Sequence, residues 1–491
     1  MNLGNVESLG YSWPEIILAL GSVSVLMLDL VVTRKERLGE LAMVIIGLAC
    51  LASGMLAGEA GWLFNRMVVV DSFAVFFKIV LGLAALATVF MSLSSKELEG
   101  QHPGEYYAIV LACTLGMFYM ASASNLLMAY LALEFVSQTS YILAGFLRHS
   151  QRSSEAALKY LIYGGVASGA MLYGLSLIYG LTGSLDYSEI GTALMSGTIE
   201  GPLLVIAILL SLAGFGYKIA MVPFHMWSPD VYEGAPLPVT AFLSVGSKAA
   251  GIALMVRFFY GGLSQPLGDG NWMTLPGVDW PSMLAVVAMV TMTLGNLTAL
   301  RQTNIKRLLA YSSIAHAGYL LMGFVVLTDA GLSAMLFYLV VYYLMNMGAF
   351  VVLLMVLNNS GREDIEAFRG LAWRGGALPA AAMMVFLFSL AGLPPFAGFV
   401  GKMYLFAAVV EREMWLLALV AAGNSVVGLY YYVRIVRAMY LDQPQESDPV
   451  MVVDNYNMAF AGALVFLTIF FGVYWAPVID FADQSLVFFR G

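Results

Sequence analysis

Apolar runs of about 20 residues recur along almost the whole chain, separated by charged or Gly/Pro-rich stretches. An α-helix needs a run of that length to cross a bilayer core of about 30 Å. The chain has 491 residues, of which 60% are hydrophobic and only 11% are charged, whereas a typical soluble domain is about 25% charged. So few charges cannot cover the surface of a water-soluble protein of this length. The sequence therefore excludes soluble, disordered and fibrous classes and predicts an all-α polytopic membrane protein.

The apolar runs predict about fourteen membrane-spanning helices. Their approximate bounds are 13–33, 40–60, 67–93, 105–122, 125–147, 154–181, 202–225, 237–260, 281–300, 305–327, 331–357, 376–410, 413–440 and 456–476. We group them into four parts. Residues 1–103 hold three helices, 104–260 hold helices 4–8, 281–440 hold helices 9–13, and 441–491 hold a loop and helix 14.

Lysine and arginine are distributed unevenly between alternate loops. With the N-terminus placed outside, fourteen of the 23 fall on the cytoplasmic side, and only Arg66, Arg412 and Arg490 fall outside. Cytoplasmic loops of membrane proteins carry such an excess of positive residues. The distribution predicts that both termini lie on the outer side of the membrane.

Two of the predicted spans are interrupted. The stretch 376–410 would be about 50 Å long as one helix, too long for a bilayer, and Pro394 and Pro395 fall within it. We expect two half-helices there. The span 202–225 runs into Pro223 and further prolines. Broken backbone at membrane depth is tolerated only where protein buries it or where it lines a wet cavity.

The two broken spans contain the same sequence, Ser-Leu-Ala-Gly, beginning at Ser211 and Ser389, 178 residues apart. The same offset aligns further positions, among them Tyr141 with Tyr319 and Tyr160 with Tyr338. The offset covers five helices, an odd number, so the two copies would lie oppositely in the membrane. Inverted repeats that each contain a discontinuous helix are typical of ion-coupled transporters.

Ionisable residues within membrane spans are costly and usually mark ion or proton pathways. Lys218 and Lys402 lie in the two broken spans, and Lys248 and Glu134 lie near the middle of their own spans. Burial disfavours the charged form of a lysine, whereas a neighbouring carboxylate favours it. Moving a glutamate toward or away from a buried lysine would therefore make that lysine hold or release a proton. The alternative for Lys218 and Lys402 is a side chain that extends to the membrane surface.

For several other polar residues the sequence leaves two roles open. Lys159 lies close to one end of its helix, where an interfacial role competes with a pathway role. His225 and His316 could relay protons because imidazole titrates near neutral pH, although buried histidines are more often hydrogen-bonded core residues. For Asp71 and Lys78 we expect structural ion pairing with each other.

The sequence also limits the chemistry of the chain itself. Its two cysteines, Cys50 and Cys113, are too few for a ligated iron–sulfur cluster. It has no P-loop and no dinucleotide-binding fingerprint, and no basic block suggests nucleic acid. Any energy for ion transport would have to come from elsewhere.

Four stretches carry a likeness to a known family: YKIAMVPFHMWSPDVYEGAPLPVTAFLSVGSKAA (217–250), LALEF (131–135), RLLAYSSIAH (307–316) and GLPPFAGFVGK (392–402). They closely resemble the subunit N family of bacterial respiratory complex I, the proton-translocating NADH-quinone oxidoreductase, and the likeness extends over essentially the whole chain. The segment PDVYEGAP (229–236) is specific, because sibling antiporter-like subunits are expected to differ there.

The resemblance implies a proton-translocating subunit with a buried axis. Glu134 and Lys218 would form a modulating acid–lysine pair, Lys248 would be the central connector, and Lys402 would face the exit side. His225, His316 and Lys159 would be further polar positions of the same axis.

The resemblance also implies where the chain works. NADH, FMN, iron–sulfur clusters and quinone would be bound by other subunits, with no cofactor on this chain. The partners would be other membrane-arm subunits and lipid, in the bacterial inner membrane.

Two other functions stay open at this level. The chain could be an Mrp-type cation/proton antiporter subunit without a redox partner, or a structural spacer whose buried charges only pair. The two halves also differ, because the 178-residue offset places Glu134 on Ser312 and Lys159 on Phe337. The second half therefore lacks its own acid–lysine pair.

Overall fold

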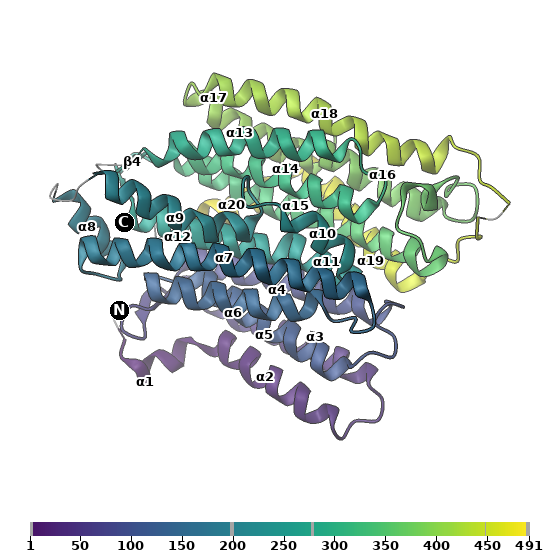
Figure 1. The fold of residues 1–491 in the computed structure, drawn as a ribbon, viewed down its shortest axis with the longest axis horizontal. Coiled ribbons are helices and arrows are strands. Elements are labelled where there is room, and N and C mark those ends of the chain that lie inside the picture. Colours follow the sequence, from purple (N-terminus) through teal and green to yellow (C-terminus); the bar gives the residue numbers. More distant parts are fainter. Residues whose placement is uncertain (1–2, 197–200, 276–278, 447, 488–491) are drawn as a thin grey trace.

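The computed structural model describes residues 3–196, 201–275, 279–446 and 448–487, and these are almost entirely helical. Long helices lie side by side with roughly parallel axes and form one elongated bundle (Figure 1). Two short antiparallel hairpins interrupt the helical order. In the first, β1 (Gly61–Leu63) pairs with β2 (Val68–Val70), and in the second, β3 (Ser264–Pro266) pairs with β4 (Trp272–Thr274).

Within its described residues, the N-terminal half contains twelve α-helices and two short helices of other kinds. In chain order they are α1 (Asn5–Ser8), the 3-10 helix η1 (Leu9–Tyr11), α2 (Trp13–Asp29), α3 (Glu36–Met55), α4 (Ser72–Leu93), α5 (Pro103–Ser122), α6 (Leu126–Ala144), α7 (Gln151–Thr182), α8 (Tyr187–Met195), α9 (Gly201–Ile219), α10 (Trp227–Gly234), α11 (Leu237–Phe242), the π-helical turn η2 (Leu243–Ser247) and α12 (Lys248–Gly262).

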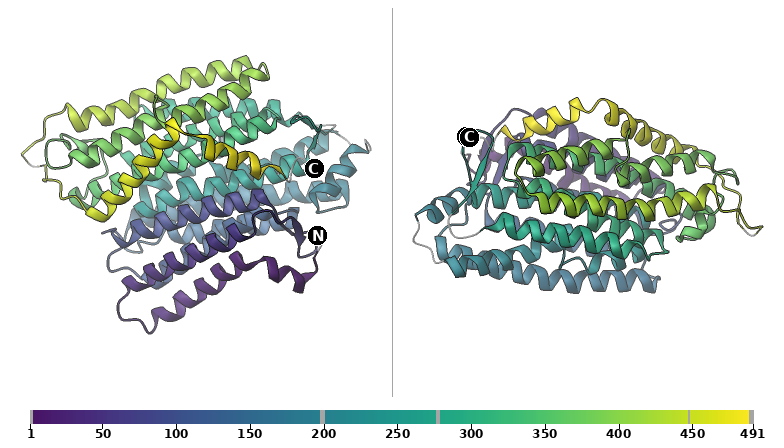
Figure 2. Two further views of the ribbon diagram at one scale, coloured as in Figure 1. Left: turned by 180° about the vertical axis from the view of Figure 1, so that it is seen from behind. Right: turned by 90° about the horizontal axis from the view of Figure 1, so that it is seen from above.

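The C-terminal half continues the bundle. Its helices are α13 (Trp280–Ala299), α14 (Ile305–Val325), α15 (Asp329–Ser360), the 3-10 helix η3 (Ile365–Phe368), α16 (Ala377–Ala391), α17 (Ala397–Glu411), α18 (Trp415–Tyr440), α19 (Asn455–Val473) and α20 (Ala476–Ser485). Seen from behind and from above, α18 and α19 run along the outside of the bundle (Figure 2).

The described residues contain 12 helices long and apolar enough to cross a membrane, or up to 13 if the bent pair Asn5–Tyr11 and Trp13–Asp29 counts as one span. The chain is therefore an all-helical polytopic membrane protein. All fourteen predicted segments contain helices. The described part of the chain has fewer than fourteen candidate spans because α2 has 17 residues and α16 and α17 have 15 each, which is short for a single span.

Both predicted interruptions coincide with breaks in the backbone. Helix α9 ends at Ile219 and α10 begins at Trp227, and Ala220 between them is left-handed with φ 59°. Helix α16 ends at Ala391, and Gly392 follows with φ 87°, a conformation that glycine adopts without a steric penalty. Each break exposes the carbonyl end of a helix inside the bundle, where the helix dipole favours a positive charge.

Helices α7 and α15 correspond closely under the offset found in the sequence. Each has 32 residues, they start 178 residues apart, and each ends at a left-handed glycine, Gly183 and Gly361. Isolated bridges join Asn125 to Asp186 and, at nearly the same offset, Asn304 to Asp364.

The core of the bundle lies between the two halves. The segment Leu237–Gly262 is buried along all of its most apolar window, and α14 and α15 are buried along 94% of theirs, whereas α18 and α19 reach only 33% and 22%. Polar side chains on α12, α14 and α15 must therefore find hydrogen-bond partners inside the bundle.

The expected Asp71–Lys78 pair is wrong. Arg257 binds Asp71 with two hydrogen bonds of 2.6 and 2.7 Å, and Lys78 pairs with Glu15 at 2.6 Å. Both ion pairs are buried and join helices that are far apart in the chain, so we assign them a structural role. Arg490, one of the three positive residues assigned to the outer side, lies outside the described residues.

Candidate functional site

Lys218 lies in the last turn of α9, directly before the break, and its side chain is only 1% exposed. Its Nζ donates a hydrogen bond to Ser137 Oγ of α6 at 3.2 Å. The stem of Lys218 packs against Gly251 of α12, where a Cβ would lie 3.2 Å from Lys218 Cγ. The ammonium is therefore held inside the bundle and does not extend to the surface.

Glu134 lies one helical turn before Ser137 on α6, so both face the same side. Its carboxylate is within electrostatic range of Lys218, but no ion pair within 4.0 Å joins them in the described part of the chain. Gln138 Nε2 donates to Glu134 Oε2 at 3.3 Å, whereas Oε1 is buried and has no hydrogen-bond partner among the described residues. Lys218 therefore donates to a hydroxyl one helical turn from this acid and makes no hydrogen bond to the acid itself among the described residues.

Lys248 follows the π-helical turn η2 and is 3% exposed. Its Nζ donates to Ser313 Oγ of α14. A cavity of ≈ 10 Å³ beside it is lined by Lys248, Ser313 and Tyr342, together with apolar side chains. That volume holds about one water molecule.

Lys402 lies on α17 and is 7% exposed. Its Nζ donates to the Ala391 carbonyl at 2.9 Å and to Ser425 Oγ at 3.5 Å, and it lies 4.6 Å from the centre of the Tyr319 ring. The Ala391 carbonyl is the C-terminal end of the half-helix α16, so Lys402 lies at the negative end of a helix dipole.

His316 lies on α14 within electrostatic range of both Lys248 and Lys402. Its Nδ1 is 2.6 Å from the Tyr338 hydroxyl and its Nε2 is 3.2 Å from the Tyr432 hydroxyl. The Tyr432 hydroxyl also contacts Ser312, the neighbour in sequence of the Lys248 partner. Hydroxyl groups therefore contact both ring nitrogens of His316, and one of them also contacts the sequence neighbour of Ser313.

Lys159 does not join this buried axis. It is 38% exposed and pairs with Asp230 at 2.6 Å and with Glu155 at 2.8 Å. Arg307 binds the other oxygen of Asp230 at 2.6 Å, and an open cleft of ≈ 250 Å³ adjoins the cluster. Burial raises the pKa of Asp230, but the hydrogen bonds from Lys159 and Arg307 outweigh it, so the pKa lies below its ordinary value.

His225 lies in the break between α9 and α10, 4% exposed, and its Nδ1 has no hydrogen-bond partner among the described residues. Within the described part of the chain, no direct hydrogen bond links His225 to Lys218 or Lys248. The structure therefore places Glu134 near Lys218, places His316 near both Lys248 and Lys402, and leaves Lys159 at the edge.

Hydroxyl-bearing residues of the site were missed in the sequence: Ser137, Ser313, Tyr338 and Tyr432. Tyr160, next to Lys159, is also fully buried, and its ring stacks on Trp227 at 4.3 Å. One signal could have found two of them, because Tyr160 and Tyr338 correspond under the 178-residue offset.

The three buried lysines differ from the buried ion pairs of this protein. Lys78 and Arg257 have carboxylates at 2.6 Å, whereas the hydrogen-bond acceptors of Lys218, Lys248 and Lys402 are hydroxyl and carbonyl oxygens. A neutral acceptor binds either form of the amine, because a neutral amine still has N–H donors. Such lysines can exchange protons in a way that a tightly paired lysine cannot.

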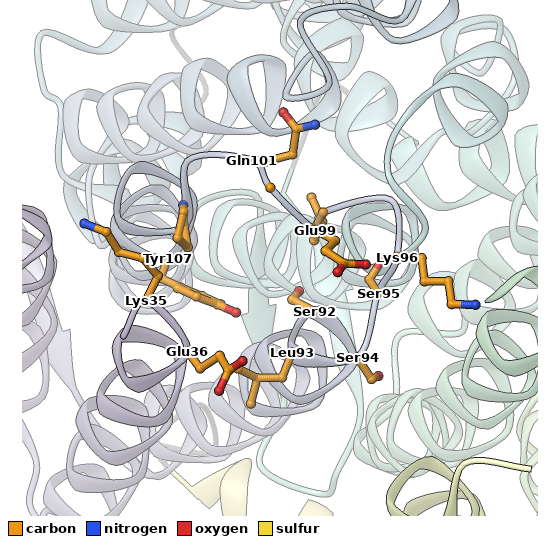
Figure 3. Close-up of a pocket in the computed structure, with 13 residues that line it drawn as sticks. Lys35, Glu36, Ser92, Leu93, Ser94, Ser95, Lys96, Glu99, Gln101 and Tyr107 are labelled. Carbon is orange, nitrogen blue, oxygen red and sulfur yellow. The ribbon is translucent and has the colours of Figure 1, made fainter. Parts of the chain in front are cut away.

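A separate open cleft of ≈ 380 Å³ lies where α3, α4 and the loop before α5 meet (Figure 3). Its two lysines are already engaged, Lys35 with Asp29 at 2.8 Å and Lys96 with the Asn358 carbonyl at 2.7 Å. It contains none of the buried lysines, and we do not assign the function to it. No cluster of side chains able to hold a metal ion occurs within the described residues.

Residues 123–428 match the profile of the NADH:quinone oxidoreductase/Mrp antiporter transmembrane family, and the chain belongs to that family. NADH-quinone oxidoreductase subunit N of Anaeromyxobacter sp. (strain Fw109-5) is 47% identical, covering 99% of this chain and 98% of that protein. Within the broader family the chain therefore belongs with the subunits N.

Two solved structures resemble the fold. A chain of respiratory complex I from Thermus thermophilus is 34% identical, with a TM-score of 0.79 over 95% of this chain and 98% of that one. A chain of the Mrp complex from Dietzia sp. DQ12-45-1b has a TM-score of 0.81 over 97% and 96%, but only 20% identity. The second likeness shows the fold alone.

Proposed function

We propose that protons move through this chain along Glu134, Lys218, Lys248, His316 and Lys402. The chain is a membrane-arm, proton-pumping subunit of NADH-quinone oxidoreductase, by its membership of the subunit N family. The observation that carries the assigned path is the absence of a carboxylate partner at each of its three lysines within the described residues, where hydroxyl and carbonyl oxygens accept their hydrogen bonds.

The first step of the mechanism concerns Glu134 and Lys218. Burial favours the neutral amine, whereas the nearby carboxylate and the carbonyl end of α9 favour the ammonium. In this state Lys218 donates to Ser137 and has no ion pair with Glu134 among the described residues. A small movement that brings Glu134 closer would load Lys218 with a proton, and its withdrawal would release that proton toward Lys248.

The middle of the path needs water as well as side chains. Tyr342 lines the small cavity beside Lys248. Several buried polar atoms have no hydrogen-bond partner within 3.5 Å among the described residues, namely Tyr160 Oη, Ser228 Oγ, Tyr232 Oη, Ser247 Oγ and Tyr342 Oη. Buried polar groups are nearly always satisfied by protein or by water. These atoms therefore support internal water molecules that would carry protons between Lys218, Lys248 and His316.

The last step concerns His316 and Lys402. Tyr338 and Tyr432 hold the imidazole by both nitrogens, so it can accept a proton on one side and donate one on the other. Lys402 would receive the proton at the end of α16 and pass it outward. Lys159 and His225 are left as accessory positions, since neither has a direct link to the axis within the described residues.

The chain itself carries no redox chemistry in this proposal. Electron transfer from NADH to quinone, with FMN and iron–sulfur clusters, would occur on other subunits of the complex. Neighbouring membrane-arm subunits and lipid would surround this chain in the bacterial inner membrane, with both termini on the periplasmic side.

The full architecture in this proposal has fourteen spans and two inverted five-helix repeats, at 104–260 and 281–440, between three N-terminal helices and the segment 441–491. Its support is the equal length and the common end of α7 and α15, and the presence of one broken helix in each half.

The alternative is an Mrp-type antiporter subunit without a redox partner. Identity favours the first function, because the subunit N relative is 47% identical and the Mrp chain 20% identical. Purification from native membranes separates the two. Co-purifying flavin and iron–sulfur subunits support the redox complex, whereas a complex that lacks both and exchanges cations for protons would overturn it.

The site assignment is tested by Lys218→Ala and Glu134→Ala in the assembled complex. We expect both variants to suppress proton pumping and the coupled oxidation of NADH, since loss of a proton-transfer group costs about 10²–10⁴-fold in the step that it serves. Normal pumping in both variants would show that these residues do not have the roles assigned here.

A further inference from the structure

Lys248 depends on an irregular turn for its position. The segment from α11 to α12 runs as one continuous span, but residues Leu243–Ser247 form a π-helical turn directly before Lys248. A π turn holds one more residue than an α turn, so the helix beyond it is rotated by about 100° relative to an uninterrupted α-helix. Without that rotation Lys248 would not face Ser313.

The π turn has a side-chain support from a helix far away in the chain. Ser244 Oγ donates to the Ala241 carbonyl at 2.7 Å, where the helical hydrogen-bond pattern changes. Asn346 Nδ2 of α15 then donates to the same Ser244 Oγ at 2.7 Å. Both Asn346 and Ser244 are fully buried, so loss of one partner would leave a buried polar group unsatisfied, which is costly.

We infer that Asn346 is a positioning residue for proton transfer, which holds the π turn through Ser244 and so keeps Lys248 turned toward Ser313. Asn346 does not contact Lys248 in the described structure and is not itself a proton carrier in this inference. The Asn346 Oδ1 atom is buried without a hydrogen-bond partner among the described residues. The hydrogen bond from Nδ2 to Ser244 is therefore the contact through which this amide acts.

This role also joins the two halves of the protein. Asn346 belongs to α15 in the second half, whereas Ser244 and Lys248 belong to the first. A shift of α15 would therefore move the π turn through the Asn346–Ser244 hydrogen bond, and with it Lys248. The inference rests on the proposed function, because it matters for pumping only if Lys248 carries protons.

The test uses the assembled complex with Asn346→Leu, which keeps the approximate volume and removes the amide. We expect assembly, a several-fold loss of proton pumping and a displaced pH optimum, and a structure of the variant complex in which Lys248 no longer contacts Ser313. The matched control is Asn457→Leu, which removes an equally buried asparagine whose partners are Ser94 and Asp454, far from Lys248 in the chain. Its pH optimum should be unchanged.

A second pair of variants keeps the inference testable if Asn346→Leu does not assemble. Ser244→Ala removes the bridging hydroxyl and should reproduce the altered pH optimum, whereas Ser244→Thr keeps the hydroxyl and should retain the wild-type optimum. A wild-type pH optimum and wild-type pumping in Ser244→Ala would overturn the inference.

Failure of the proposed function is distinguished by Lys248→Met. If Lys248→Met pumps normally, the role of Lys248 itself is wrong. If Lys248→Met stops pumping while Asn346→Leu and Ser244→Ala behave as the wild type does, only the positioning role of Asn346 is wrong.

Discussion

Lys402 Nζ donates a hydrogen bond to the Ala391 carbonyl at 2.9 Å, across the break between α16 and α17. The contact places a positive charge at the free carbonyl end of a half-helix, where the dipole stabilises it. Burial of the same group favours its neutral form. The balance of these two effects suits a site that must bind a proton and release it, and small changes of geometry would shift that balance.

The first prediction separates proton transfer from mere charge pairing at this position. Arginine keeps the positive charge but cannot lose its proton in a protein. Lys402→Arg should therefore preserve assembly and abolish most pumping. The matched control is Lys306→Arg, because Lys306 is also buried and also binds a helix-end carbonyl, Ala235 at 2.8 Å, but has Glu363 as an ion-pair partner at 3.1 Å. Near-normal pumping by Lys402→Arg would favour the structural role.

The second prediction concerns the coupling of Glu134 to Lys218. If the carboxylate acts through the lysine, the effects of Glu134→Gln and Lys218→Met on pumping should not add, and the double variant should resemble Lys218→Met alone. The measurement is the initial rate of proton uptake by inverted membrane vesicles supplied with NADH. Strictly additive losses, expressed as free energies, would mean that the two residues act independently.

The third prediction concerns stability at the second break. Gly392 has φ 87°, and a Cβ there would lie 2.8 Å from Lys402 Cδ. Gly392→Ala should lower the stability by about 1–2 kcal/mol, the usual cost of a left-handed alanine, and should lower the melting temperature of the purified complex. Gly423→Ala is the control, because a Cβ there meets nothing within 4 Å and alanine stabilises a helix relative to glycine by up to about 1 kcal/mol. Equal melting temperatures for the two variants would contradict this explanation.

The fourth prediction concerns pH and the charged cluster at Asp230. Its hydrogen bonds with Lys159 and Arg307 lower the pKa of the carboxyl group below its unfolded value, despite the opposing effect of burial. The stability that Asp230 contributes is therefore fully present above the pKa of its carboxyl group in the unfolded chain. It is lost only as the pH falls through the lower pKa of that group in the folded protein. The melting-temperature difference between wild type and Asp230→Asn should stay constant from about pH 6 to pH 8. A difference that vanishes within that range would mean that another group controls it.

The sequence could locate the buried lysines because a charge within an apolar run stands out. Lys218, Lys248 and Lys402 were predicted as interior groups, and each is at most 7% exposed. Their partners could not be predicted in the same way. Ser137 and Ser313 are hydroxyls in helices, and such residues often bind only their own backbone.

Long-range pairing and local irregularity were the other limits. Asp71 and Lys78 lie two helical turns apart and so looked like a pair, but each found a closer partner, Arg257 and Glu15 respectively, on another helix. The π turn before Lys248 leaves no sign in the pattern of apolar residues, because the whole segment is buried. The breaks at Pro223 and Pro395 could be predicted because proline cannot continue the hydrogen bonding of a helix.

The most direct test of the central claim is the number of protons pumped per NADH oxidised by the complex reconstituted in vesicles, with Lys248→Met and Lys402→Met combined in this chain. The buried axis predicts that the complex assembles and that the ratio falls or coupled turnover stops. An unchanged ratio at an unchanged rate of NADH oxidation would contradict the assignment of a proton path to these lysines.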